Sequence, residues 1–283
     1  MSRRPNFNLA TVAMAVMSML AWTAAAAERT SPFSRQTVTL EAGAFLSDFD
    51  TRLTLSGPEG GTEIALEDDL NLKDDQAAFR ANLAWRFANR HTLGIGYYSF
   101  NRSDTGVIEE SFVVDTEDQT LEFVGSAVVQ SRFDWDLIPV TYAYSFILTD
   151  RLETSASVGL HWASTTVGFA GEAFVDGSSV AQGASESESV SAPLPVFGLS
   201  LNYALTPRWF VGTHFQYFGL DYEDISGDLV DLRIKTTYWF GERFGAGVGY
   251  TWYDIDLDAD DGAYQFKFDY RYNGLEAFLN FRF

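Results

Sequence analysis

Leu275-Glu-Ala-Phe-Leu-Asn-Phe-Arg-Phe283 ends the chain, and its side chains alternate between two chemical kinds. One face of an extended strand would carry Leu275, Ala277, Leu279, Phe281 and Phe283, and the other would carry Glu276, Phe278, Asn280 and Arg282. A period of two predicts a β-strand with one face in an apolar medium and the other in a mostly polar one. A soluble domain would expose this aromatic strand at a sheet edge, whereas a closed barrel has no edge.

A hairpin pattern recurs four times in the chain: an aromatic-rich strand end, a turn of a few residues, an Arg and a new alternating run. The copies are Trp85–His91, Tyr144–Arg151, Tyr203–Trp209 and Tyr238–Phe244. Tight turns between antiparallel strands have this form. Four hairpins give eight strands, and a first strand from Gln36 and a last strand from about Ala263 bring the expected total to about ten, with both termini at one end.

Two segments leave eight or twelve strands as alternatives. In the last strand the apolar parity switches at Asn273-Gly274, from Phe266, Phe268, Tyr270 and Tyr272 to Leu275, Ala277 and Leu279. We interpret this switch as a β-bulge, and a hairpin at Asn-Gly would instead change the strand count. Near the other end of the chain, Asp50–Ser56 and Gly61–Glu67 could form an extra hairpin above or within the barrel wall.

The terminal stretch resembles the C-terminal signature of Gram-negative outer-membrane β-barrel proteins, in which a terminal Phe is read by the barrel-assembly machinery. Phe281 and Phe283 would be that assembly signal here. The resemblance implies an all-β fold: a closed antiparallel up-and-down transmembrane β-barrel with short periplasmic turns and long extracellular loops. It also implies outer-membrane lipids, lipopolysaccharide and the assembly machinery as partners.

The start of the chain has the features of a secretory signal peptide. Arg3-Arg4 precedes the apolar run Leu9–Trp22, and Ala24–Ala27 offers a small-residue cleavage site. We therefore predict that residues 1–27 are a signal for Sec export and that residues 28–283 form the barrel, in the outer membrane. The expected extracellular loops are about 48–75, 103–130 and 171–191.

The charge of the chain limits its partners. It has 39 Asp+Glu against 19 Lys+Arg, a net charge of −20 at pH 7, and losing Arg3 and Arg4 makes the barrel more acidic still. Nucleic acid is therefore not an expected partner, because phosphate binding needs a basic surface. With no cysteine, thiolate metal sites and disulfides are excluded. We predict no cofactor and no built metal site, and only loosely bound Ca²⁺ or Mg²⁺ at the acidic loops.

Strand parity places charged side chains of both signs inside the barrel. Those that we expect to line the lumen and to set any selectivity are Glu41, Arg80, Arg86, Glu153, His214, Asp231, Arg233 and Lys235. The last three occupy successive inward positions of one strand, which is the best place for a selectivity ring or for a packing network. In a narrow barrel such groups either fill the interior as salt bridges or line a thin water path.

The leading functional hypothesis is a structural or passive small-solute channel of the porin-like kind. The alternative is a surface adhesin or ligand-binding protein acting through acidic extracellular loops, and the third hypothesis is a lipid-modifying enzyme or protease. His161 and His214 face inward by parity, but neither has the Ser on its own strand face that the lipid A deacylase pattern requires. The residue two positions before His214 is Gly212, where omptin proteases have an Asp. We therefore predict no enzyme, while a catalytic site assembled from different strands stays open.

Overall fold

The computed structural model describes residues 32–33, 37–57, 60–69, 72–107, 112–115, 120–123, 128–171, 174–175, 178–179, 184–222, 225–260 and 265–283. The predicted signal peptide, residues 1–27, lies outside the described residues. Within them, the regular structure consists of strands, and no helix is long and apolar enough to cross a membrane.

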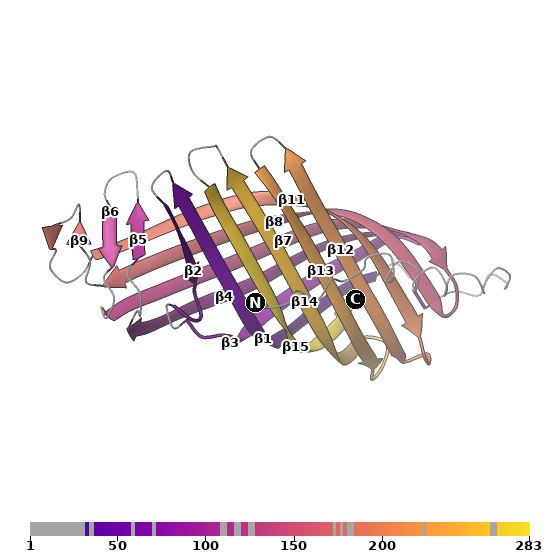
Figure 1. The fold of residues 1–283 in the computed structure, drawn as a ribbon. Coiled ribbons are helices and arrows are strands. Elements are labelled where there is room, and N and C mark those ends of the chain that lie inside the picture. The colour runs from indigo at the N-terminus through magenta and orange to yellow at the C-terminus, as the bar shows by residue number, and fades with distance from the viewer. Residues whose placement is uncertain are drawn as a thin grey trace.

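Ten long strands close into one antiparallel barrel (Figure 1). They are β1 (Thr37–Gly57), β3 (Asp75–Ala88), β4 (His91–Val107), β7 (Val128–Leu148), β8 (Leu152–Gly171), β11 (Ala184–Ala204), β12 (Trp209–Tyr222), β13 (Ile225–Trp239), β14 (Phe244–Asp260) and β15 (Gln265–Arg282). Each pairs with the next in this order, and β15 returns to pair with β1, with Leu275 opposite Leu46. The predicted closed barrel of ten strands is confirmed, and the alternatives of eight and twelve are wrong.

Short strands add to the barrel at the end opposite the tight turns. β2 (Gly60–Ala65) pairs with the last part of β1, so the suspected extra hairpin exists as an addition to the ten-stranded closure. A separate four-stranded sheet contains β5 (Phe112–Asp115), β6 (Thr120–Phe123), β9 (Phe174–Val175) and β10 (Ser178–Ser179), and Figure 1 shows β5, β6 and β9 at this end. The barrel strands themselves continue into the segments expected to be loops: β1 reaches Gly57, β4 reaches Val107 and β8 reaches Gly171.

The four recurring sequence patterns form tight turns at one end of the barrel, called here the short-turn end. These turns occupy residues 89–90, 149–151, 205–208 and 240–243. At the third turn, the Trp209 amide lies 3.0 Å from Thr206 Oγ1, which satisfies a backbone donor where the ladder stops. The hairpins inferred from Trp85–His91 and its three counterparts are therefore confirmed.

Large apolar side chains cover the outside of the barrel next to the short-turn end. Leu46 and Leu275 are 70% and 67% exposed, and exposed aromatic residues lie at both edges of the covered zone. Its members include Leu83, Trp85, Ile95, Tyr97, Val140, Tyr144, Val158, Trp162, Leu199, Tyr203, Trp209, Ile234, Tyr238, Val248, Tyr250 and Leu279. A water-soluble monomer does not expose so large an apolar zone, and an apolar belt with aromatic girdles is typical of membrane barrels. We call this part of the barrel the lipid-facing half.

Beyond this zone the apolar side chains change sides. On β15, Leu275 and Leu279 point outward, whereas Phe268, Tyr270 and Tyr272 are buried inside the barrel. The register of β15 with β1 and with β14 is continuous through Asn273-Gly274, so the expected bulge and the alternative hairpin are both wrong. The parity switch instead marks the point where the medium outside changes from lipid to water. We call the part beyond it the loop-end half.

An aromatic plug fills the lumen of the loop-end half. Phe100, Phe133, Trp135, Tyr253, Tyr270 and Tyr272 form its centre, and each is 2% exposed or less. Trp135 packs on Tyr270 with ring centroids 4.9 Å apart, and Tyr253 stacks on Tyr272 at 4.8 Å. Such ring pairs stabilise by about 0.5–1.5 kcal/mol each beyond the area they bury. The loop-end half is therefore built like a soluble barrel, with water outside and an apolar core inside.

Candidate functional site

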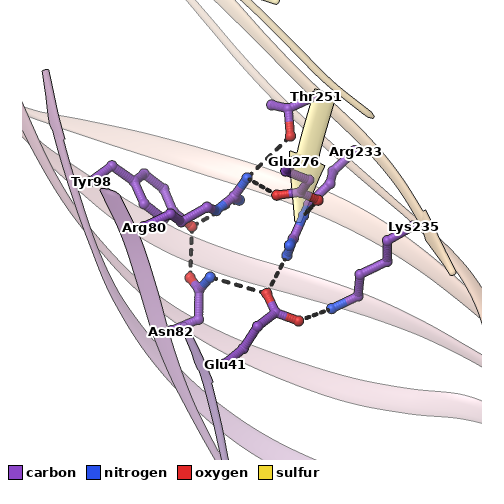
Figure 2. Close-up of polar contacts among 8 residues, drawn as sticks. All are labelled: Glu41, Arg80, Asn82, Tyr98, Arg233, Lys235, Thr251 and Glu276. Carbon is purple, nitrogen blue, oxygen red and sulfur yellow. Dashed lines mark hydrogen bonds and ion pairs between the residues drawn. The ribbon is translucent and has the colours of Figure 1, made fainter. Parts of the chain in front are cut away.

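The lumen of the lipid-facing half is polar and holds a network of ion pairs (Figure 2). Arg233 from β13 contacts two carboxylates: its Nη1 lies 2.7 Å from Glu41 Oε1 and its Nε 2.5 Å from Glu276 Oε1. Lys235 Nζ lies 2.7 Å from Glu41 Oε2. Arg80 Nη1 lies 3.5 Å from Glu276 Oε2. Each of these carboxylates is thus shared by two cations, and the network joins strands from opposite parts of the chain.

Neutral side chains extend this network around the wall. Arg80 Nη2 donates to the Tyr98 hydroxyl at 3.0 Å, and that hydroxyl donates to Asn82 Oδ1 at 2.7 Å. Asn82 Nδ2 in turn donates to Glu41 at 3.3 Å, which closes a circuit that Figure 2 shows. Buried charges are tolerated only when they are paired and hydrogen-bonded in this way. The side chains of this network therefore link strands to one another across the lumen.

The predicted lumen residues all face inward, but they divide into separate groups. Glu41, Arg80, Arg233 and Lys235 belong to the network just described. Nearer the short-turn end, Arg86 pairs with Glu153, which also accepts a hydrogen bond from Ser145 at 2.6 Å. Asp231 is buried without an ion-pair partner in the described part of the chain, and His214 lines a cavity. Their role in selectivity stays a prediction, as does the role of Phe281 and Phe283 in assembly.

A partly open cavity of about 240 Å³ lies beside the ion-pair network. Its polar lining includes Tyr98, Thr141, Ser200, Asn202, His214, Gln216, Asp231, Arg233 and Lys235. Glycine makes room for two of the amides: a Cβ at Gly212 would lie 2.5 Å from Asn202 Oδ1, and one at Gly96 would lie 2.7 Å from Asn82 Oδ1. The aromatic plug lies on the loop-end side of this cavity, and Lys235, whose side chain is 31% exposed, lines its short-turn side.

Two polar contacts in this region join different strands. Ser200 Oγ lies 2.6 Å from His214 Nδ1, because the register of the 205–208 turn places these residues opposite each other on β11 and β12. His161 Nε2 lies 3.0 Å from Gln216 Oε1. A Ser on the same strand face as His214 is absent from the sequence pattern, and Ser200 escapes that pattern because it lies on the neighbouring strand β11. Counting residues outward from the turn would have found the pair.

The outside of the loop-end half carries a groove of about 650 Å³ on β12 to β15. Its charged lining consists of Asp221, Asp228, Asp256, Asp258, Lys267 and Asp269. Burial, followed by hydrogen bonding and repulsion from Asp269, raises the pKa of Asp256 to about 7. Burial also raises the pKa of Asp228 and, nearby, that of Asp254. Among the described residues, no cluster of His, Asp and Glu has the arrangement of a metal site.

The closed ten-stranded barrel, the apolar belt and the polar lumen define the class: a Gram-negative outer-membrane β-barrel protein. No protein-family model matches the chain, and no curated protein sequence matches it. Among solved structures it is similar to the outer-membrane protease OmpT from Escherichia coli, with 11% identity, a TM-score of 0.58, and coverage of 90% of this chain and 99% of that chain.

Two further solved structures have lower TM-scores. The transport unit of the autotransporter AIDA-I from Escherichia coli is 10% identical, with a TM-score of 0.43 and 99% of each chain covered. The attachment invasion locus protein Ail from Yersinia pestis is 8% identical, with a TM-score of 0.33, and the match covers 88% of this chain and 99% of that chain. At these identities the likeness to OmpT shows the fold alone. The fold agrees with location in the outer membrane, where the short-turn end is periplasmic.

Proposed function

We propose that this protein is a surface-exposed outer-membrane barrel that binds a cationic partner, such as a basic peptide, through the groove on its loop-end half. The observation that carries the proposal is a row of carboxylates across three adjacent strands. Asp256 on β14 lies opposite Asp228 on β13 and opposite Asp269 on β15. Like charges placed directly opposite each other on a sheet are destabilising, so a bound cation would relieve this repulsion.

The cations around the row compensate only part of its charge. Lys267 pairs with Asp258 at 2.9 Å, and Arg271 pairs with Asp254 at 3.0 Å. Asp228, Asp256 and Asp269 have no such ion pair among the described residues. A concave surface of one sign attracts ligands of the other sign and speeds their association. The groove residues also lie on strands held by the aromatic plug, which gives them a rigid support.

A porin-like channel is less well supported than surface binding. The plug residues Trp135 and Tyr270 are buried at the centre of the loop-end lumen, and the ion pairs of Arg233 occupy the layer beneath them. A permeating solute would have to displace both layers. The sealed lumen agrees better with a structural barrel that presents its outer surface to a partner.

Binding of fluorescent oligolysine to cells that display the protein tests the proposal. The groove variant Asp228→Asn/Asp256→Asn/Asp269→Asn should lose at least about tenfold in affinity, because charge pairs with a ligand are worth about 1 kcal/mol or more when partly desolvated.

The matched control removes the same number of charges elsewhere, at the exposed Glu63, Asp68 and Asp74. The variant Glu63→Gln/Asp68→Asn/Asp74→Asn should bind almost as the wild type does. Equal losses in both variants would show that net charge alone attracts the peptide and would reject the groove as the site.

A further inference from the structure

The cavity in the lipid-facing half contains a serine and a histidine in the arrangement of a nucleophile and its base. Ser200 Oγ lies 2.6 Å from His214 Nδ1, and both side chains are half-buried and line the cavity. Many lumen serines are simply packed against the wall. Ser157, for example, is a buried serine on the neighbouring strand β8, and its Oγ has no hydrogen-bond partner in the described structure. Ser200 differs in having both a base and open space beside its oxygen.

A third polar side chain lies beside the pair. Gln216 follows His214 by two positions on the same inward face of β12 and lines the same cavity. Its Oε1 lies 3.0 Å from His161 Nε2. With its proton on Nε2, His214 presents a free Nδ1 that can accept from the Ser200 hydroxyl. A nucleophile and a base within hydrogen-bond reach are the core of the arrangement used in nucleophilic catalysis.

We propose that Ser200 and His214 form an acyl-transfer site that hydrolyses small esters reaching the lumen from the periplasmic side. Ser200 Oγ attacks the ester carbonyl carbon while His214 Nδ1 accepts the hydroxyl proton. The carbon–oxygen bond of the ester then breaks, and His214 returns the proton to the leaving alkoxide, which departs as an alcohol. Water attacks the acyl-serine, with its proton passing through His214, and the carboxylic acid leaves as Ser200 is restored. Atoms balance without an oxidant or another reactant.

The cavity limits the substrate class. Its volume of about 240 Å³ suits a short acyl ester. Asn202, Arg233 and Lys235 also line it and are the donors available to the oxyanion that forms at the attacked carbonyl. The Lys235 side chain is 31% exposed, which shows that the lumen beside it admits water.

A fluorophosphonate probe, which phosphonylates activated serines, tests the proposal on the full-length protein folded in detergent. Mass spectrometry of the wild type should find the adduct on Ser200 and none on Ser157. His214→Gln should slow labelling about 100-fold or more, the contribution of a general base. Ser200→Ala should abolish both the adduct and the hydrolysis of p-nitrophenyl acetate, whereas Ser157→Ala should leave both unchanged.

Heat-dependent migration on gels confirms that each variant is folded, which separates loss of the site from loss of the barrel. Folded wild type without an adduct on Ser200 would overturn the proposal. So would an adduct that forms equally fast in His214→Gln, because Ser200 would then react without its base. The proposal is independent of the outer groove, and neither test depends on the other.

Discussion

Tyr270 and Leu275 lie five positions apart on one unbroken strand, yet Tyr270 is fully buried inside the barrel and Leu275 is 67% exposed outside it. Residues five positions apart on a strand point to opposite faces. The apolar side chains of β15 therefore change from the inner face at Tyr270 to the outer face at Leu275. The same change occurs on β7, between Val140 outside and Trp135 inside. The outer medium therefore changes from lipid to water between these levels, and the apolar core moves from the belt into the lumen.

The aromatic plug should prevent ion conduction. In planar bilayers we expect no discrete conductance steps from the wild type, because Trp135 and Tyr270 fill the lumen above the cavity. The double variant Trp135→Ala/Tyr270→Ala should conduct in small steps, since it removes two rings that pack on each other at the centre of the plug. Trp162→Ala, which removes an exposed lipid-facing ring, is the control and should show no conductance steps. Regular steps in the wild type would show that the plug moves aside and would favour the porin-like hypothesis.

The plug should also contribute strongly to folding. Tyr270→Ala removes a fully buried ring and should lower the free energy of unfolding by about 3–5 kcal/mol, the usual cost of a large cavity. Leu220→Ala, at an exposed position of the same half, should change it by less than about 1 kcal/mol. Urea titrations in lipid vesicles measure both. Equal effects would mean that the loop-end half has no core of its own.

The lipid-facing belt and the tight turns could be predicted from the sequence, because each follows from a pattern of neighbouring residues that recurs along the chain. Alternation around Trp85, Tyr144, Tyr203 and Tyr238 gave the hairpins, and their number gave the barrel. The aromatic plug could not be predicted in this way. A parity switch at Asn273-Gly274 has the same pattern whether the strand bulges or the solvent outside it changes, and only pairing with both neighbours distinguishes these cases. The Ser200–His214 contact likewise depends on register between strands.

The ion-pair network should be needed for stability, whatever passes through the lumen. Glu41→Gln leaves Arg233 and Lys235 without the carboxylate that they share, and removing one partner of a buried pair costs about 3–5 kcal/mol. The second change in Glu41→Gln/Lys235→Met removes one of the two cations that lost this carboxylate and should recover part of the loss. Urea unfolding measures both. A single variant as stable as the wild type would show that water, rather than Glu41, solvates these cations.

Cation binding at the outer groove should strengthen as pH rises through about 7, where Asp256 ionises. The pKa of this carboxyl is raised above its ordinary value of 3.8, so the folded protein holds a proton between those values that the unfolded chain has released. Its contribution to stability therefore falls with rising pH in this window, while the negative charge available to a cation grows. The charged groups facing Asp256 or flanking it are Asp228, Asp254, Asp258, Lys267, Asp269 and Arg271.

Oligolysine affinity measured between pH 5.5 and pH 8.5 tests this dependence, because the peptide's ammonium groups keep their charge throughout that range. The wild type should bind several-fold more tightly at the upper end. Asp256→Asn should remove most of this rise, since no proton is then released near neutral pH, whereas the exposed Asp68→Asn should preserve it. An unchanged rise in Asp256→Asn would assign the titration to another carboxylate of the row. A flat profile in the wild type would show that Asp256 is already ionised at pH 5.5 and that Asp269 does not share its proton.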